Sequence, residues 1–204
     1  DGAGIVCGSN TWRIFDDCWR YITMDTATTK RTASDYTVAS AWAITPDNSL
    51  VLLDVARAQT TEDEQLELAR PLVEKWRPEC TWIEPSMRTT LLVRQAIAEG
   101  WHLDDLKADT NKLVRAAPAT RLVKQGRLWM PAQHRELDTV VKEMKQFPNG
   151  RHDDFVDTLS YAELIHHQEY VPAGTGVEQS PAPETDPYGP AVLQPPLDYE
   201  AARW

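Results

Sequence analysis

Carboxylate side chains stand at three places in the sequence where an acidic group is costly unless it has a partner or a task. Asp25 interrupts an apolar run that is typical of a β-strand, and Glu84 ends a second apolar run at 80–83. The third place is the segment 152–157, which reads His-Asp-Asp-Phe-Val-Asp and opens a stretch with helical periodicity. Each feature alone has an ordinary structural explanation, because a strand-end aspartate can start a turn and helix acids complement the helix dipole.

Taken together, the three places predict metal-assisted phosphoryl transfer. Two strand-end carboxylates and a helix-borne carboxylate can converge on one point, and hard oxygen ligands favour Mg²⁺ or Mn²⁺. Two such cations about 4 Å apart could bind one phosphate, one activating a water for in-line attack and the other stabilising the leaving oxygen. On the helix, spacings of three and four residues place Asp157 beside Asp153 and Asp154. His152 adjoins this cluster, where it could orient a carboxylate, contact a phosphate or simply begin the helix.

The elements that must position these acids follow from the hydrophobic pattern. Segments rich in β-branched and aromatic residues, separated by turn signals, predict consecutive antiparallel strands at 19–27, 36–45 and 49–57. A helical pattern then ends at Pro78, and a buried parallel strand at 80–83 carries Glu84 at its carboxyl end. The elements expected after it are a helix at 88–99, a strand at 101–108, a helix at 112–124, a strand at 127–130 and helices at 133–146 and 151–167. This order predicts an α/β fold with a mixed sheet, three antiparallel strands followed by parallel strands, flanked by helices.

Length and composition bound the class of protein. With 204 residues, 42% of them hydrophobic and 25% charged, the chain has the size of one domain with appendages. No apolar run approaches the roughly 20 residues that span a bilayer and no signal peptide is visible, so we expect a cytoplasmic protein without a membrane partner. Cys7, Cys18 and Cys80 lie far apart without a C-x-x-C pair, which predicts buried, reduced thiols.

The charge distribution bears on nucleic-acid binding. A net charge of -10 argues against a protein that coats nucleic acid through its overall field. Lysine and arginine nevertheless outnumber acids between residues 107 and 135, and two further basic residues lie in the turn after the first predicted strand. These stretches could contact a DNA backbone or could simply be solvated. The candidate DNA-contacting residues are Lys30, Arg31, Lys112, Arg115, Lys124 and Arg127.

Three regions are expected along the chain. Residues 1–18 are interpreted as a linker or N-terminal extension, and residues 19–170 as the folded domain. In residues 171–204, seven prolines with scattered glycine and acidic residues replace any apolar periodicity, which predicts a disordered or extended tail.

Several of these segments resemble the nuclease domain of phage terminase large subunits, which has a ribonuclease H-like fold. Residues 23–27 with 34–37 are similar to the D-x-A … S-D-Y-T start of these domains, and residues 81–84 to their second acidic strand. Residues 124–131 are similar to their late strand. Phe147-Pro148 followed by 152–162 resembles their closing F-P … H-D-D-x-V-D-A-x-x-Y-A motif, which is the most specific part. The resemblance covers roughly residues 21–165.

The resemblance implies an endonuclease that cuts double-stranded viral DNA concatemers at the start and end of genome packaging with two divalent cations, Mg²⁺ or Mn²⁺. It implies Asp25, Glu84 and Asp154 as the catalytic, metal-binding acids and Asp153 as an auxiliary metal ligand. Asp157 and His152 are further candidates. The implied partners are DNA, a portal protein, a small terminase subunit and an ATPase domain, acting in the host cytoplasm at the procapsid portal. That ATPase is not in this sequence, because no glycine is followed by lysine and a phosphate-binding P-loop requires that pair.

Two alternatives remain open from the sequence. Holliday-junction resolvases and transposases use comparable carboxylates on the same fold, although the closing motif favours a terminase. A different class of hypothesis is a catalytically silent module that docks to portal or capsid partners, in which the acids only cap helices. Metal-dependent nicking of DNA distinguishes this module from a nuclease.

Overall fold

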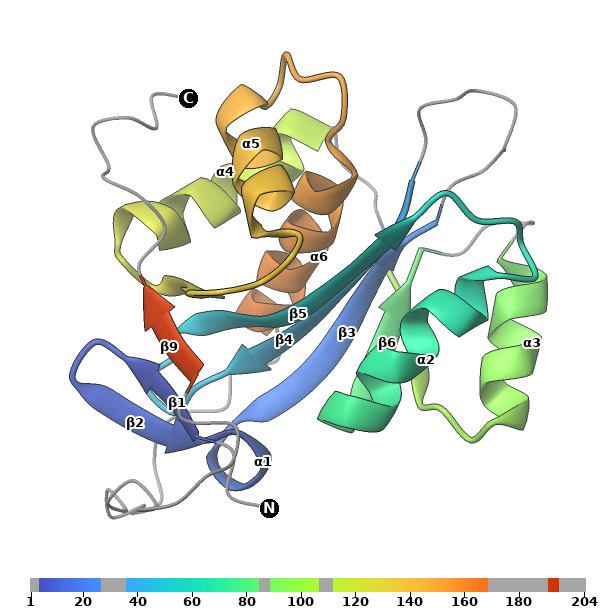
Figure 1. Cartoon of the computed structure of the whole chain (residues 1–204), viewed down its shortest axis with the longest axis horizontal. Coiled ribbons are helices and arrows are strands. Elements are labelled where there is room, and N and C mark those ends of the chain that lie inside the picture. The colour runs from blue at the N-terminus through green and yellow to red at the C-terminus, as the bar shows by residue number, and fades with distance from the viewer. Residues whose placement is uncertain (1–3, 27–35, 85–88, 107–111, 169–190, 195–204) are drawn as a thin grey trace.

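The computed structural model describes residues 4–26, 36–84, 89–106, 112–168 and 191–194, which form one mixed sheet with helices on both faces (Figure 1). The strand order in the sheet is β2-β1-β9-β8-β5-β4-β3-β6-β7. The strands are β1 (Gly4–Cys7), β2 (Asn10–Arg13), β3 (Trp19–Asp25), β4 (Thr37–Ile44), β5 (Leu50–Ala58), β6 (Cys80–Ile83), β7 (Leu103–Asp105), β8 (Leu128–Pro131) and β9 (Ala191–Gln194). The helices are α1 (Ile14–Asp17), α2 (Gln65–Trp76), α3 (Thr90–Ala98), α4 (Lys112–Lys124), α5 (Leu137–Gln146) and α6 (Asp154–Gln168).

Five neighbouring strands form the part of the sheet that positions the acids. Strands β3, β4 and β5 pair antiparallel, while β6 pairs parallel with β3 and β7 pairs parallel with β6. The predicted mixed sheet, with three antiparallel strands followed by parallel ones, is therefore confirmed. Every residue of β4 is buried, which fits a central strand covered on both faces.

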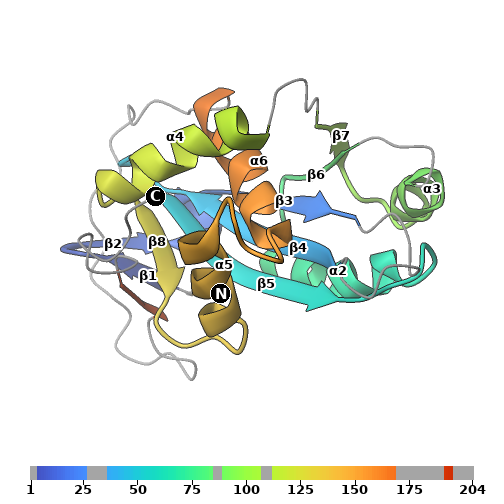
Figure 2. The same cartoon turned by 90° about the horizontal axis from the view of Figure 1, so that it is seen from above.

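The two faces of the sheet carry separate hydrophobic cores because side chains alternate along each strand. On β3, Tyr21 packs with helices α4, α5 and α6, whereas Ile22 and Met24 pack with α2 and α3 on the opposite face. Helix α6 lies against β3 and β4 (Figure 2). The acids at the strand ends are thus placed between a rigid sheet and a long helix.

The N-terminal segment is more structured than the expected linker. Residues 4–13 form a β-hairpin, β1 with β2, and Ile5 and Ile14 are buried in the core on the α2 face. Strand β9 pairs with β1 on one side and β8 on the other, so part of the expected tail adds a strand to the sheet. Short segments without strong periodicity gave no sequence signal for these strands. The boundaries of the nuclease-like domain itself stay a prediction.

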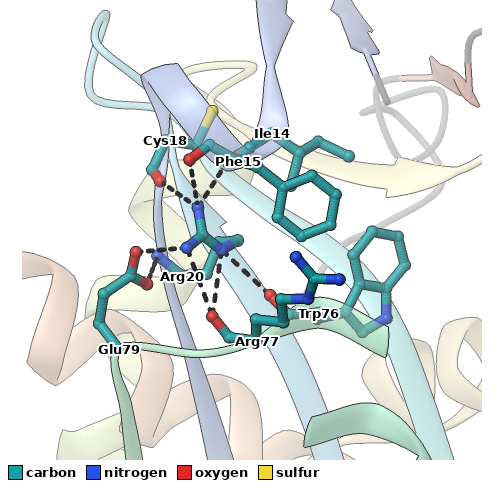
Figure 3. Close-up of polar contacts among 7 residues, drawn as sticks. All are labelled: Ile14, Phe15, Cys18, Arg20, Trp76, Arg77 and Glu79. Carbon is teal, nitrogen blue, oxygen red and sulfur yellow. Dashed lines mark hydrogen bonds and ion pairs between the residues drawn. The ribbon is translucent and has the colours of Figure 1, made fainter. Parts of the chain in front are cut away.

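Buried Arg20 ties this segment to the rest of the domain (Figure 3). Its guanidinium donates to the carbonyls of Ile14, at 3.0 Å, and Trp76, also at 3.0 Å, and it forms a 2.6 Å ion pair with Glu79. Further carbonyl acceptors are those of Phe15, Cys18 and Arg77. Helix ends leave carbonyls without intrahelical partners, and a guanidinium with five donors can satisfy several of them at once. One side chain therefore fixes α1, β3 and the end of α2 together.

The start of helix α5 and the burial of Cys80 differ from the sequence predictions. Helix α5 begins four residues later than predicted, because the His134 ring accepts from the backbone N–H of Glu136 and pairs with Asp54 instead of entering the helix. Cys7 and Cys18 are buried free thiols, and burial raises the pKa of Cys7 to about 12, while Cys80 is half-buried. The described helices include none that is long and apolar enough to cross a membrane.

Candidate active site

The two strand-end acids lie in a row of residues that crosses the neighbouring strands β6, β3, β4 and β5. Asp25, the last residue of β3, is paired with Val38 of β4, and Val38 is paired with Arg57 of β5. On the other side, Met24 of β3 is paired with Ile83 of β6, so Glu84 follows β6 at the level of Asp25. Residues paired across strands point to the same face of a sheet. The row places Glu84 and Asp25 on adjacent strands, about 5 Å apart in backbone spacing, with Arg57 two strands further along.

Helix α6 brings the third acid to this row. The Tyr21 hydroxyl donates a 2.7 Å hydrogen bond to the Ala162 carbonyl, and the Thr23 hydroxyl donates one of 3.0 Å to the Thr158 carbonyl. A step of two residues along β3 therefore corresponds to a step of four residues along α6, because each step covers about 6 Å. The same step carried once more places Asp25 at the level of Asp154, in the first turn of α6.

The same face of α6 also reaches Glu84. The hydroxyl of Tyr161 donates a 2.6 Å hydrogen bond to the Glu84 carboxylate. Asp157 lies one turn before Tyr161 on this helix and is 9% exposed, and its backbone N–H donates to the carbonyl of Asp153. The structure thus brings the end of β6 and the first two turns of α6 together.

Asp154 is surrounded by charged groups from two other elements. One amino group of Arg57 lies 3.4 Å from the Asp154 carboxylate, and the other lies 2.6 Å from the carboxylate of Glu143 on α5. Burial, then the negative charge of Glu143, raise the pKa of Asp154 to about 6 against the opposing effect of Arg57. The His152 ring lies 4.0 Å from the Asp154 carboxylate and packs edge-on against Tyr36. A cation bound beside a carboxyl group with a raised pKa would stabilise its ionised form.

The donor set fits a hard divalent cation by its chemistry. Asp25, Glu84 and Asp154 offer carboxylate oxygens only, which suit Mg²⁺ and Mn²⁺. As the side chains stand in the described residues, no three histidine, cysteine, aspartate or glutamate side chains are grouped to hold a metal ion. Asp154 instead contacts Arg57, and Glu84 contacts Tyr161. A cation shared by the three acids would have to bind Asp154 beside the guanidinium or displace it.

Two of the predicted basic residues, Lys124 and Arg127, have described side chains, and both lie away from this site. Lys124 ends α4 and is exposed, and Arg127 binds the carbonyl of Asn48 at the turn before β5. Because Leu128 pairs with Leu50 at the start of β5, both cations lie at the opposite end of the strand from Arg57. The backbones of Lys112 and Arg115 lie in α4 but their side chains are outside the described residues, as are Lys30 and Arg31. Their DNA contacts stay predictions.

Sequence reasoning missed the groups that hold the acids. Arg57 and Glu143 were not singled out, and Tyr36 and Tyr161 were quoted only as parts of the opening and closing motifs. Arg57 did carry a signal, since a charged residue near the end of an apolar strand is costly without a partner. Glu143 carried none, because a glutamate in a lysine-rich helix is ordinarily solvated.

Comparisons with known proteins agree with this architecture. The family model described as the terminase RNase H-like domain matches residues 22–164, which is more than half of the chain. Among solved structures, the magnesium-bound large terminase nuclease from thermophilic phage G20c has 17% sequence identity and a TM-score of 0.56, covering 73% of this chain and 82% of that one. The zinc-bound crystal structure of the same nuclease has 19% identity and a TM-score of 0.55, covering 72% and 80%. At such identities the likeness shows the ribonuclease H-like fold. A search of curated proteins found no match.

Proposed function

Because this chain belongs to the family of terminase RNase H-like domains, we propose that it is a metal-dependent endonuclease that cuts double-stranded viral DNA during genome packaging. The observation that carries the proposal is the placement of Asp25 and Glu84 at neighbouring strand ends, against which the first turns of α6 are packed. Glu84 and Asp25 end adjacent parallel strands, and α6 presents Asp154 at the level of Asp25. The family assignment favours this reading over a resolvase or transposase, while a silent docking module is left for experiment to exclude.

In the proposed reaction, Asp25, Glu84 and Asp154 would hold two divalent cations, Mg²⁺ or Mn²⁺. Asp153 is an auxiliary ligand, with Asp157 and His152 as further candidates. Bound cations would supply an activated water for in-line attack and stabilise the leaving oxygen. Tyr161 fixes the orientation of the Glu84 carboxylate, and Arg57 together with Glu143 fixes the start of α6. The protein's contribution is then geometric, because the sheet and helix hold the acids before the substrate arrives.

The proposed substrate is the concatemeric DNA that is cut when packaging starts and ends. Magnesium, zinc and cobalt are each bound in crystal structures of the G20c large terminase nuclease, which supports a divalent cation here. The proposed partners are a portal protein, a small terminase subunit and an ATPase domain, at the procapsid portal in the host cytoplasm. An acidic domain of net charge -10 should bind DNA weakly by itself, so these partners would supply much of the affinity.

Cleavage of supercoiled plasmid by the full chain tests the proposal. With Mn²⁺ or Mg²⁺ we expect nicked and linear products, no products with chelator, and a loss of about a hundredfold or more in Asp25→Asn, Glu84→Gln and Asp154→Asn. The matched control is Asp16→Asn, which removes an exposed carboxylate at the opposite end of β3. Cleavage without metal, or site variants as active as the control, would refute the assignment. Absence of cleavage by folded wild type, with or without a supplied ATPase domain, would favour the docking module.

A further inference from the structure

Arg57 is held between two carboxylates in a largely dry environment. Its side chain is 10% exposed, that of Glu143 is 5% exposed and that of Asp154 is 16% exposed. The guanidinium lies 2.6 Å from Glu143 and 3.4 Å from Asp154, and its central carbon lies 3.9 Å from the centroid of the Tyr36 ring. A buried guanidinium requires charge compensation, and a planar one also stacks on an aromatic ring. These contacts therefore fix both the position and the plane of the group.

The two carboxylates are not equivalent partners. Glu143 is anchored from a second side, because its other oxygen accepts a 3.0 Å hydrogen bond from the backbone N–H of Phe155 in the first turn of α6. The contact of Arg57 with Asp154 is 0.8 Å longer than its contact with Glu143, the difference between 3.4 Å and 2.6 Å. Glu143 therefore has an anchor on α6 that does not depend on Arg57, while the contact with Asp154 is the longer of the two. The contact with Asp154 is the one that can be exchanged for another cation.

Resting on the proposed metal-dependent function, we propose that Arg57 is a positioning residue that serves as the counter-charge of Asp154 until a divalent cation takes its place. Glu143 holds Arg57 beside the site during this exchange. The Arg57–Glu143 pair then sets how strongly the site binds metal: Arg57 opposes the incoming cation by charge, and Glu143 offsets that opposition. Neither residue touches the metal in this scheme.

The scheme predicts opposite effects from the two partners. Arg57→Gln removes the competing charge, so the Mn²⁺ concentration for half-saturation should fall, on the order of tenfold. Arg57→Lys keeps the charge while losing the planar geometry, so half-saturation should stay within about twofold of wild type. Glu143→Gln removes the carboxylate that restrains Arg57, so the guanidinium competes more strongly for Asp154 and the required Mn²⁺ concentration should rise. A merely structural role would weaken metal binding in all three variants alike.

The experiment is a titration of the full chain with Mn²⁺, following free Mn²⁺ by electron paramagnetic resonance, with a melting curve for each variant. Arg70→Gln is the control, because Arg70 lies on α2 at the other face of the sheet and pairs with Glu67 and Glu99. Tighter Mn²⁺ binding by Arg57→Gln than by Arg57→Lys supports the inference. The comparison of these two variants is decisive even if Glu143→Gln does not fold. Equal or weaker binding by Arg57→Gln overturns it. No binding by wild type would overturn the proposed metal site, and the inference with it.

Discussion

The hydroxyl of Tyr161 donates a 2.6 Å hydrogen bond to the carboxylate of Glu84, which lies 77 residues earlier in the chain. The bond joins the end of β6 to the second turn of α6, and it fixes one of the two strand-end acids relative to the helix that carries Asp154. A carboxylate that must bind a cation in one orientation benefits from such an outer partner.

Tyr161→Phe should therefore slow DNA cleavage by about tenfold or more while the protein stays folded. The loss follows from a Glu84 carboxylate that is free to rotate rather than from a missing ligand. Initial rates at saturating Mn²⁺, together with circular dichroism, measure the effect. Tyr21→Phe is the matched control, because the Tyr21 hydroxyl donates its hydrogen bond to the helix backbone at Ala162 rather than to a candidate acid. Equal rates in the two variants would contradict the role given to Tyr161.

Thr23 joins the sheet to α6 through its hydroxyl, which donates to the Thr158 carbonyl and accepts a 2.9 Å hydrogen bond from the indole of Trp42. Thr23→Val should reduce the free energy of unfolding by about 1 to 3 kcal/mol, because it leaves the buried indole N–H without an acceptor. Thr23→Ser keeps the hydroxyl and should cost much less. Urea denaturation of the three proteins measures the difference, and a valine variant as stable as the serine variant would show that the hydroxyl is not needed.

Asp54 is the centre of a second charged network and predicts a pH dependence of stability. Burial would raise the pKa of Asp54, but hydrogen bonds from His134, Lys75 and Trp76, at 2.8, 2.8 and 3.1 Å, outweigh it and hold the pKa well below its usual range. A carboxylate whose folded pKa is lowered adds stability above its unfolded pKa of about 4, and that stability is lost as the pH falls further.

Asp54→Asn should therefore lower the free energy of unfolding by about 2 kcal/mol at neutral pH, with a gap to wild type that narrows below about pH 4. Denaturation curves between pH 3 and pH 7 give this dependence. Asp16→Asn, which loses only an exposed ion pair with Arg13, should differ little from wild type at any pH. A gap for Asp54→Asn that is constant with pH would contradict the lowered pKa.

The central sheet could be predicted from sequence because its strands carry their own signals. The antiparallel strands β3, β4 and β5 are rich in β-branched and aromatic residues and are separated by turn residues, and the structure confirms them. The hairpin β1–β2 and strand β9 were missed, because four-residue strands that close one edge of a sheet depend on pairing partners far along the chain.

The candidate site divides in the same way. Asp25 and Glu84 stand out along the chain as acids at strand ends, whereas the choice of Asp154 among the acids at the start of α6 came from the resemblance to terminase nucleases. Of their neighbours, Arg57 carried only the signal of a charge near the end of an apolar strand and Glu143 carried none, because this pair joins β5 to α5 and forms only when those elements pack together. Side chains that tune a site are set by tertiary contacts, which leave no periodic trace in the sequence.

Anomalous diffraction from crystals of the full chain soaked in Mn²⁺ tests the central claim most directly. The account predicts manganese density at the edge of the sheet where β3 and β6 end, coordinated by Asp25, Glu84 and Asp154, and lost in Asp154→Asn crystals grown under the same conditions. Manganese bound at this edge without these carboxylates, bound only elsewhere, or absent from crystals whose site is open to solvent would contradict it.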